Sequence, residues 1–239
     1  MRRTVFFLAF GVLLWGQSVR GEASEAWREV SPGFSYLRNT ETGAHLFKVN
    51  PAKWRVSVLR AKDYSQAALS VRRYRERSEA ALAINGGFFN GQFESLGLLV
   101  QQGHSVSPLR QASWGVFSIS GGRPTIQSSR DYNTTDPAVE MAIQAGPRLV
   151  VNGILSKLKE SLPERRSAIG ITPDREVLLA VTDNPLLMTE WAKLLQVYAT
   201  DVLNLDGGGS TQLSVKLKNL TIQVDGETNV PNAVALFPH

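Results

Sequence analysis

Residues 202–213 read VLNLDGGGSTQL, and this stretch organises the rest of the chain. An apolar run ends in a carboxylate and is followed by glycines and hydroxyls: Asp206, Gly207, Gly208, Gly209, Ser210 and Thr211. Three successive glycines bury no side chains, but they allow close approach to the backbone, and successive N–H groups can bind an anion. The stretch therefore predicts a strand that leads into the floor of an active site. A glycine-rich bulge is the purely structural alternative.

A second loop follows an apolar run at residues 81–84. It begins with an amide, continues with glycines and ends in aromatic rings: Asn85, Gly86, Gly87, Phe88 and Phe89. An amide above a closely approachable backbone, beside an aromatic wall, suits a sugar-binding site. Asn-Gly is also a common turn signal, so a tight turn with both phenylalanines in the core is the alternative.

Three further charged residues stand at the ends of predicted strands. Arg166 precedes an apolar strand, where its guanidinium could clamp a phosphate bidentately. Arg148 follows a Gly-Pro kink, and Asp183 ends the run 177–182. Each has a plain alternative as a surface charge or a turn residue. The chain's three histidines share no ligand spacing, which gives a zinc site or a Ser-His-Asp triad little support.

The first 21 residues resemble an export signal. Arg2 and Arg3 precede an apolar run at 5–15 that is too short to span a bilayer comfortably. An uncleaved N-terminal anchor is the alternative. Cleavage would leave residues 22–239 as a single domain without cysteines, periplasmic or secreted, with no stable membrane span. The signal carries three arginines and no acid, so the net charge of +5 falls to +2 on cleavage, and nucleic-acid binding is not expected.

Many short strands and two helices, at residues 65–80 and 189–198, are predicted for the rest of the chain. Hairpins are expected at Asn152-Gly153 and between residues 167–172 and 177–182. Regular β-α-β alternation is lacking. These patterns predict an α+β fold, with a mixed or largely antiparallel twisted sheet and two main helices in one domain.

The two glycine loops, in this order and with the strand RSAIGI at 166–171 between them, resemble the phosphodiester glycosidase family, which includes N-acetylglucosamine-1-phosphodiester α-N-acetylglucosaminidase. Residues 145–153, 189–195 and 231–234 also fit, so the resemblance runs from about residue 56 to the C-terminus. The TDNP sequence at 182–185 departs from it, since a glycine-containing turn is more usual there.

The resemblance implies hydrolysis of a sugar-1-phosphodiester on an envelope or extracellular glycan, with glycosidic C–O cleavage and release of a phosphomonoester. Cleavage of a glycosidic bond needs a carboxylate beside the oxocarbenium-like centre. Asp206 is the first candidate, as nucleophile or general base, and Asp183 is the second. Donors to the anionic leaving group are expected from Arg166 and the loop from Gly207 to Thr211, and Arg148 is a further substrate-binding candidate. Asn85 could orient sugar hydroxyls or water, and Phe88 or Phe89 could stack on the sugar ring.

Other interpretations stay open. No cofactor is expected, although Asp206, Asp183 and an amide would suit a divalent cation. The expected partner is a glycan or a sugar phosphate. The chain could also bind a periplasmic glycan, or assist envelope assembly, without turning a substrate over. A phosphodiesterase that breaks the P–O bond is a third reading.

Overall fold

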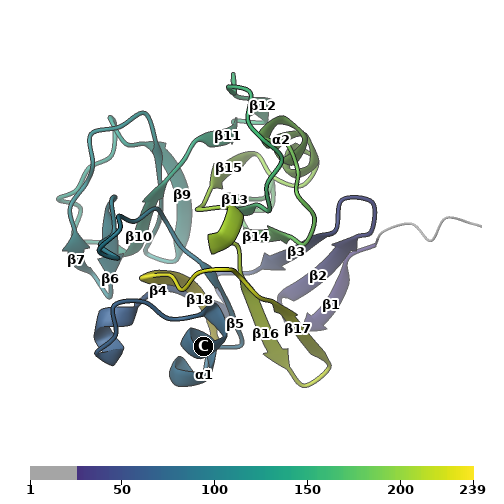
Figure 1. Cartoon of the computed structure of the whole chain (residues 1–239), viewed down its shortest axis with the longest axis horizontal. Coiled ribbons are helices and arrows are strands. Elements are labelled where there is room, and N and C mark those ends of the chain that lie inside the picture. Colours follow the sequence, from purple (N-terminus) through teal and green to yellow (C-terminus); the bar gives the residue numbers. More distant parts are fainter. Residues whose placement is uncertain (1–25) are drawn as a thin grey trace, which may run out of the picture.

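Three antiparallel sheets form the framework of the computed structural model, which describes residues 26–239 (Figure 1). The predicted export signal lies outside the described residues. The first sheet has the strand order β1 (Arg28–Ser31), β2 (Phe34–Asn39), β3 (Ala44–Val49), β14 (Val177–Thr182), β13 (Ser167–Ile171), β15 (Asp201–Asn204), β11 (Arg148–Val151) and β12 (Ile154–Leu155).

The other two sheets have five strands each. The second runs β7 (His104–Ser107), β6 (Leu99–Gln101), β10 (Val139–Ala145), β8 (Gly115–Ser120) and β9 (Arg123–Ser128). The third runs β17 (Leu220–Val224), β16 (Leu213–Leu217), β5 (Leu82–Asn85), β18 (Asn232–Pro238) and β4 (Trp54–Arg60). Both predicted hairpins are confirmed, as β13 with β14 and as β11 with β12.

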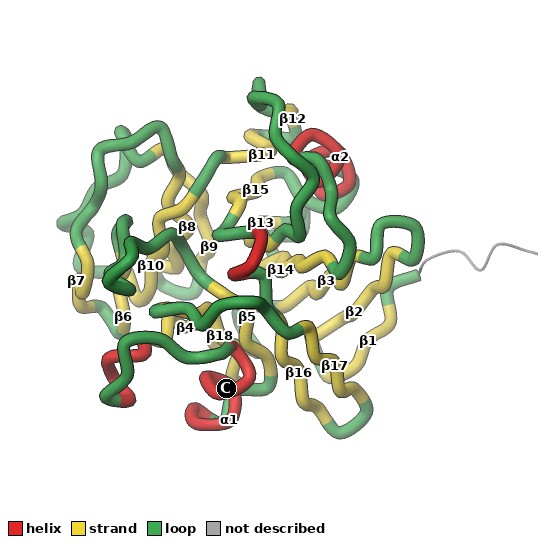
Figure 2. Tube along the Cα trace, viewed as in Figure 1, coloured by secondary structure: helices red, strands yellow, loops and turns green. Residues whose placement is uncertain are grey.

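Helices contribute little to this architecture, as the colours of Figure 2 show. They are α1 (Val71–Ser78), α2 (Met188–Gln196) and the short 3-10 helices Ala61–Tyr64 and Gly208–Ser210. The second predicted helix is confirmed within two residues at each end. The first is shorter than predicted, because Ser65 adopts a positive φ of 56° that ends the preceding 3-10 turn, and Ser70 caps the helix instead.

The prediction of an α+β fold is wrong. Every strand pairing in residues 26–239 is antiparallel, and the two α-helices are too few and too short to form a layer of their own. Instead α2 covers the outer face of the first sheet through Trp191 and Leu195, and α1 covers the third sheet through Val71 and Tyr74. The fold is a β-rich sandwich.

One apolar core joins the inner faces of all three sheets. It contains Phe34 and Phe47 from the first sheet, Phe117 from the second, and Ile84 and Val234 from the third. Strands β13 and β14 are buried along their whole length, since the core covers one face and α2 the other. None of the helices in the described part of the chain has the length and apolar character needed to cross a membrane.

The sheets also meet where β5 and β15 end. The N–H of Asp206, just beyond β15, donates to the carbonyl of Gly86, just beyond β5 (3.1 Å). Gly87 lies against Gln144 of β10 in the second sheet. The two glycine loops predicted to form the site therefore lie side by side, at the junction of the three sheets.

Candidate functional site

Asn85 is fully buried at the end of β5 and uses both ends of its amide. Its Nδ2 donates to the carbonyl of Asp206 (2.7 Å). Its Oδ1 accepts from the Ser167 hydroxyl (2.7 Å) and the Gln212 N–H (3.1 Å). The side chain thus joins the third sheet to the Asp206 loop and to β13. It holds the Asp206 loop in place from the interior of the protein.

The glycines after Asn85 are required by close backbone packing. A Cβ on Gly87 would lie 2.7 Å from the carbonyl oxygen of Gln144, and one on Gly86 would clash with the side chain of Asn232. The Asn232 Oδ1 also accepts from the Gly87 N–H (2.8 Å). Phe88 then packs on Trp114, with ring centroids 4.9 Å apart.

The Asp206 loop is a compact turn. Gly208 has a φ of +60°, a conformation that favours glycine. Four backbone N–H groups of the loop already have acceptors, namely Gly207 on the Asp206 carboxylate, Gly208 on the Arg165 carbonyl, and Ser210 and Thr211 on the Gly207 and Gly208 carbonyls. These donors stabilise the turn, and the row of free N–H groups expected from the sequence is not seen. The Thr211 hydroxyl is buried without a hydrogen-bond partner.

The carboxyl group of Asp206 is half-buried at the edge of this turn. Burial is the largest influence on its pKa and raises it. Hydrogen bonds from Ser210 and the Gly207 N–H oppose the rise, and the nearby Glu164 raises the pKa by the smallest contribution. The net effect is a raised pKa. A carboxylate of raised pKa is a stronger base, so Asp206 is suited to accepting and returning a proton.

Glu164 supplies a second carboxylate that the sequence analysis missed. Its backbone is fixed by a two-way bridge to Leu186, with N–O distances of 3.1 and 2.9 Å. Its carboxyl carbon lies 3.7 Å from the point that a Cβ on Gly208 would occupy. The side chain is half exposed, so this acid faces both the Asp206 loop and solvent.

Arg166 is only 4% exposed and holds the segment that carries Glu164. Its guanidinium donates to the carbonyls of Leu186 (3.1 Å) and Leu162 (2.8 Å), to the Ser161 hydroxyl (3.2 Å) and to the Glu164 carboxylate (3.3 Å). These bonds use four of its five N–H donors. The Nη1 atom lies 3.9 Å from the Cβ point of Gly207, so one donor remains on the side of the Asp206 loop.

Asp183 is directed to a different cluster. Its carboxylate accepts from Arg38 Nη2 (2.7 Å) and lies 3.2 Å from Nε2 of His45. The Nδ1 atom of His45 lies 2.9 Å from the Tyr36 hydroxyl. These partners belong to β2 and β3, so the expected pairing of Asp183 with Asp206 is not seen.

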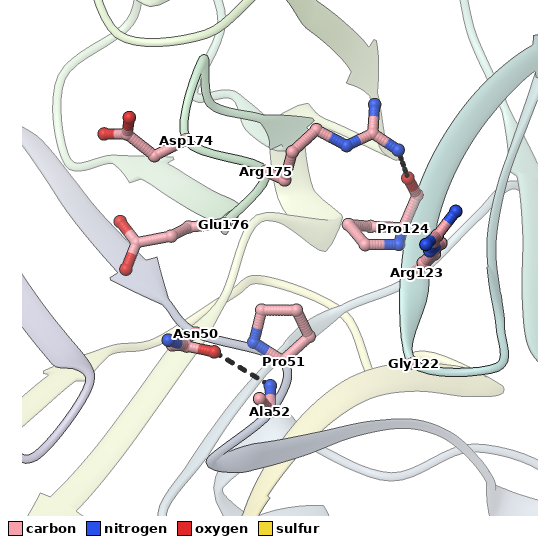
Figure 3. Close-up of a pocket in the computed structure, with 9 residues that line it drawn as sticks. All are labelled: Asn50, Pro51, Ala52, Gly122, Arg123, Pro124, Asp174, Arg175 and Glu176. Carbon is pink, nitrogen blue, oxygen red and sulfur yellow. Dashed lines mark hydrogen bonds between the residues drawn. The ribbon is translucent and has the colours of Figure 1, made fainter.

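Two cavities bear on the location of the site. Arg148 and Trp114 line one of about 550 Å³, which adjoins Phe88. Figure 3 shows another, of about 490 Å³, beside Asp174 and Arg175. It opens at the turn between β13 and β14, at the far end of β13 from Arg166, and none of the predicted site residues line it.

A metal ion lacks an obvious set of ligands. Among residues 26–239, no group of three or more His, Asp or Glu side chains is arranged to hold one. Asp183, one of the two expected carboxylate ligands, is bound to Arg38 and His45 instead. The divalent-cation hypothesis stays a prediction.

Comparison with known proteins includes both glycine loops in one family match. The sequence profile of the family described as phosphodiester glycosidase matches residues 78–237, which include both glycine loops and the strand between them. The uncharacterized protein YigE of Escherichia coli is 27% identical over 89 residues. That match covers 34% of this chain and 35% of YigE, about a third of each.

Three solved structures share the fold. The catalytic domain of zebrafish N-acetylglucosamine-1-phosphodiester α-N-acetylglucosaminidase, auto-inhibited by its pro-peptide, has a TM-score of 0.68 at 16% identity, over 89% of this chain and 86% of that one. A hypothetical protein from Synechocystis gives 0.60 at 17% identity, over 87% and 63%. A putative exported protein of Burkholderia pseudomallei gives 0.60 at 13% identity, over 86% and 74%.

Proposed function

This chain belongs to the phosphodiester glycosidase family, and from that premise we propose that it hydrolyses a sugar-1-phosphodiester and releases a phosphomonoester. The observation that carries the proposal is the half-buried Asp206, whose pKa is raised, beside the second carboxylate Glu164. Two carboxylates flanking the scissile bond are the usual equipment of a glycosidase. The predicted export signal further supports an envelope or extracellular glycan as the substrate, in the periplasm or outside the cell.

In the proposed reaction, water attacks the anomeric carbon while the C–O bond to phosphate breaks. The bonding electrons leave on the phosphate oxygen, and Asp206 takes the proton released by water. A phosphate leaving group is already stabilised as an anion, so the step needs little help from a general acid. Glu164 raises the basicity of Asp206 and favours the positive charge that develops on the sugar ring.

The test is turnover by the full-length protein of a hexosamine 1-phosphate methyl ester, with a sugar-free phosphodiester as the comparison substrate. The protein is expected to release methyl phosphate from the first and to leave the second intact. Asp206→Asn should reduce the rate roughly 10²- to 10⁴-fold, as loss of a general base does. Asp174→Asn, in the distant turn of Figure 3, is the matched control and should retain the rate.

Two results would count against the proposal. Equal hydrolysis of the sugar-free ester would indicate a phosphodiesterase that breaks the P–O bond. Binding of the sugar ester without turnover would indicate a glycan-binding protein that uses this fold for recognition alone.

A further inference from the structure

The cavity of about 550 Å³ beside Trp114 lies outside the proposed catalytic centre but adjoins it. Its volume is in the range of sites that bind a small ligand. It is lined by three segments of the chain: residues 113 and 114, residues 146–148, and residues 156–161, together with Met188. Ser161 in its wall accepts a hydrogen bond from Arg166, so the segment that carries Glu164 also forms the cavity.

Trp114 gives this cavity a fixed aromatic wall. Its ring packs against Phe88 of the first glycine loop, and the Arg110 guanidinium lies 5.6 Å from its centroid. A Cβ on Gly146 would lie 2.9 Å from the Trp114 ring, so glycine is needed there for the ring to fit. A half-exposed indole held on several sides is a suitable platform for a sugar ring.

The charge of the cavity is predominantly positive. Arg148, Lys157 and Lys159 line it, against the single acid Glu160. Within residues 26–239, these three cations take part in none of the ion pairs, which join other residues. Unpaired basic side chains around one cavity favour an anionic ligand, and charge-assisted hydrogen bonds would hold a phosphate strongly.

We propose that this cavity binds a phosphorylated sugar, with the ring on Trp114 and the phosphate on Arg148, Lys157 and Lys159. The inference rests on the proposed function in one respect, since it makes the ligand a second residue of the substrate. The substrate class then becomes a glycan that carries a further phosphate next to the bond that is cleaved. The same cavity would also take a free sugar phosphate.

Binding can be measured without turnover, by calorimetric titration of the full-length Asp206→Asn protein. Glucose 6-phosphate is expected to bind at least about tenfold more tightly than glucose or inorganic phosphate, because only it engages both the ring and the cations. Trp114→Ala and the double variant Lys157→Gln/Lys159→Gln should each weaken binding about tenfold. Trp114→Phe keeps an aromatic ring against Phe88, and should bind better than Trp114→Ala if the platform matters.

The control is Lys216→Gln/Lys218→Gln, which removes two lysines from the distant hairpin of β16 and β17 and should leave binding unchanged. Inorganic phosphate binding as tightly as glucose 6-phosphate, or no effect of Trp114→Ala and the 157/159 pair, would overturn the inference. A bound sugar phosphate in a protein that hydrolyses no phosphodiester would overturn the proposed function and leave the cavity assignment standing. Hydrolysis of the phosphodiester without sugar-phosphate binding would overturn the cavity assignment and leave the proposed function standing.

The substrate preference of the wild-type protein distinguishes a second sugar residue of the substrate from a free sugar phosphate as the ligand of the cavity. A substrate with an additional 6-phosphate on the neighbouring sugar should have a kcat/KM about tenfold higher than its unphosphorylated counterpart. Binding of free glucose 6-phosphate together with equal kcat/KM values would overturn the placement of a second substrate residue in the cavity.

Discussion

Burial of Asp206 in the folded protein disfavours the ionised form of its carboxyl group. Because its pKa is higher in the folded protein, the unfolded chain releases the proton more readily. The stabilising contribution of the protonated group is therefore complete below the unfolded pKa and is lost as the pH rises through the folded pKa. Catalytic suitability at this residue is gained at the expense of stability at neutral pH.

Asp206→Asn should for this reason raise the melting temperature of the protein at about pH 7 more than at about pH 4. Asparagine keeps an oxygen that can accept from the Gly207 N–H, so the turn retains its hydrogen bond. Thermal unfolding followed by circular dichroism at the two pH values measures the difference. An increase of the same size at both would show that ionisation of Asp206 does not oppose folding.

Glu164 adds a small contribution to the raised pKa of Asp206, which burial dominates. Its removal in Glu164→Gln lowers the pKa of Asp206, so the acidic limb of the pH–rate profile should move to lower pH and the maximal rate should fall. The measurement is kcat/KM as a function of pH.

Glu227→Gln is the matched control for this prediction. Glu227 lies beside the next glycine of the loop, with Oε2 3.4 Å from the Cβ point of Gly209, but it is not among the groups that shift the pKa of Asp206. The acidic limb should stay in place in this variant. If the acidic limb of the pH–rate profile stays in place in Glu164→Gln, Glu164 does not influence the pKa of Asp206.

At the scale of elements, the Asn85 side chain joins the end of β5 to the Asp206 loop, beside the backbone hydrogen bond from the Asp206 N–H to the Gly86 carbonyl. Asn85→Ala would leave the buried Ser167 hydroxyl, the Gln212 N–H and the Asp206 carbonyl without their partner. The free energy of unfolding should fall by about 2–4 kcal/mol, as expected for several unsatisfied buried groups. Urea denaturation measures this free energy.

The control is Asn229→Ala on the exposed surface, which should change the free energy of unfolding by less than about 0.5 kcal/mol. A similarly small effect of Asn85→Ala would contradict the role of Asn85 in joining β5 to the Asp206 loop.

Local patterns in the sequence predicted many short strands and the two hairpins, and the family resemblance assigned the two glycine loops to one site. They did not predict the neighbours of each strand end. Asp183 and Asp206 both follow strands, but β13 lies between β14 and β15, and the Asp183 carboxylate points to β2 and β3. Glu164 has no motif of its own, because its position depends on a bridge to Leu186, more than twenty residues away.

For the molecule as a whole, the family could be predicted from two motifs but the fold class could not. Residues 65–80 have a helical pattern, yet only Val71–Ser78 form the helix. The individual strand-forming segments do not indicate that three separate sheets share one apolar core. Long-range pairing decides between a sandwich and an α+β fold, and periodicity within one segment does not report it.

The shared core predicts cooperative unfolding. Phe47, Phe117 and Ile84 come from different sheets and belong to the same apolar cluster, so none of the sheets keeps its inner face covered without the others. Urea transitions followed by tryptophan fluorescence and by far-ultraviolet circular dichroism should coincide. Two separate transitions would indicate that one sheet unfolds independently.

The central claim is cleavage of the glycosidic C–O bond at the Asp206 loop, and hydrolysis in ¹⁸O-labelled water tests it most directly. Mass spectrometry of both products locates the oxygen supplied by water. Label on the anomeric carbon of the released sugar, with none in the phosphomonoester, is the predicted result. Label in the phosphomonoester, which requires the P–O bond to break, would contradict the claim.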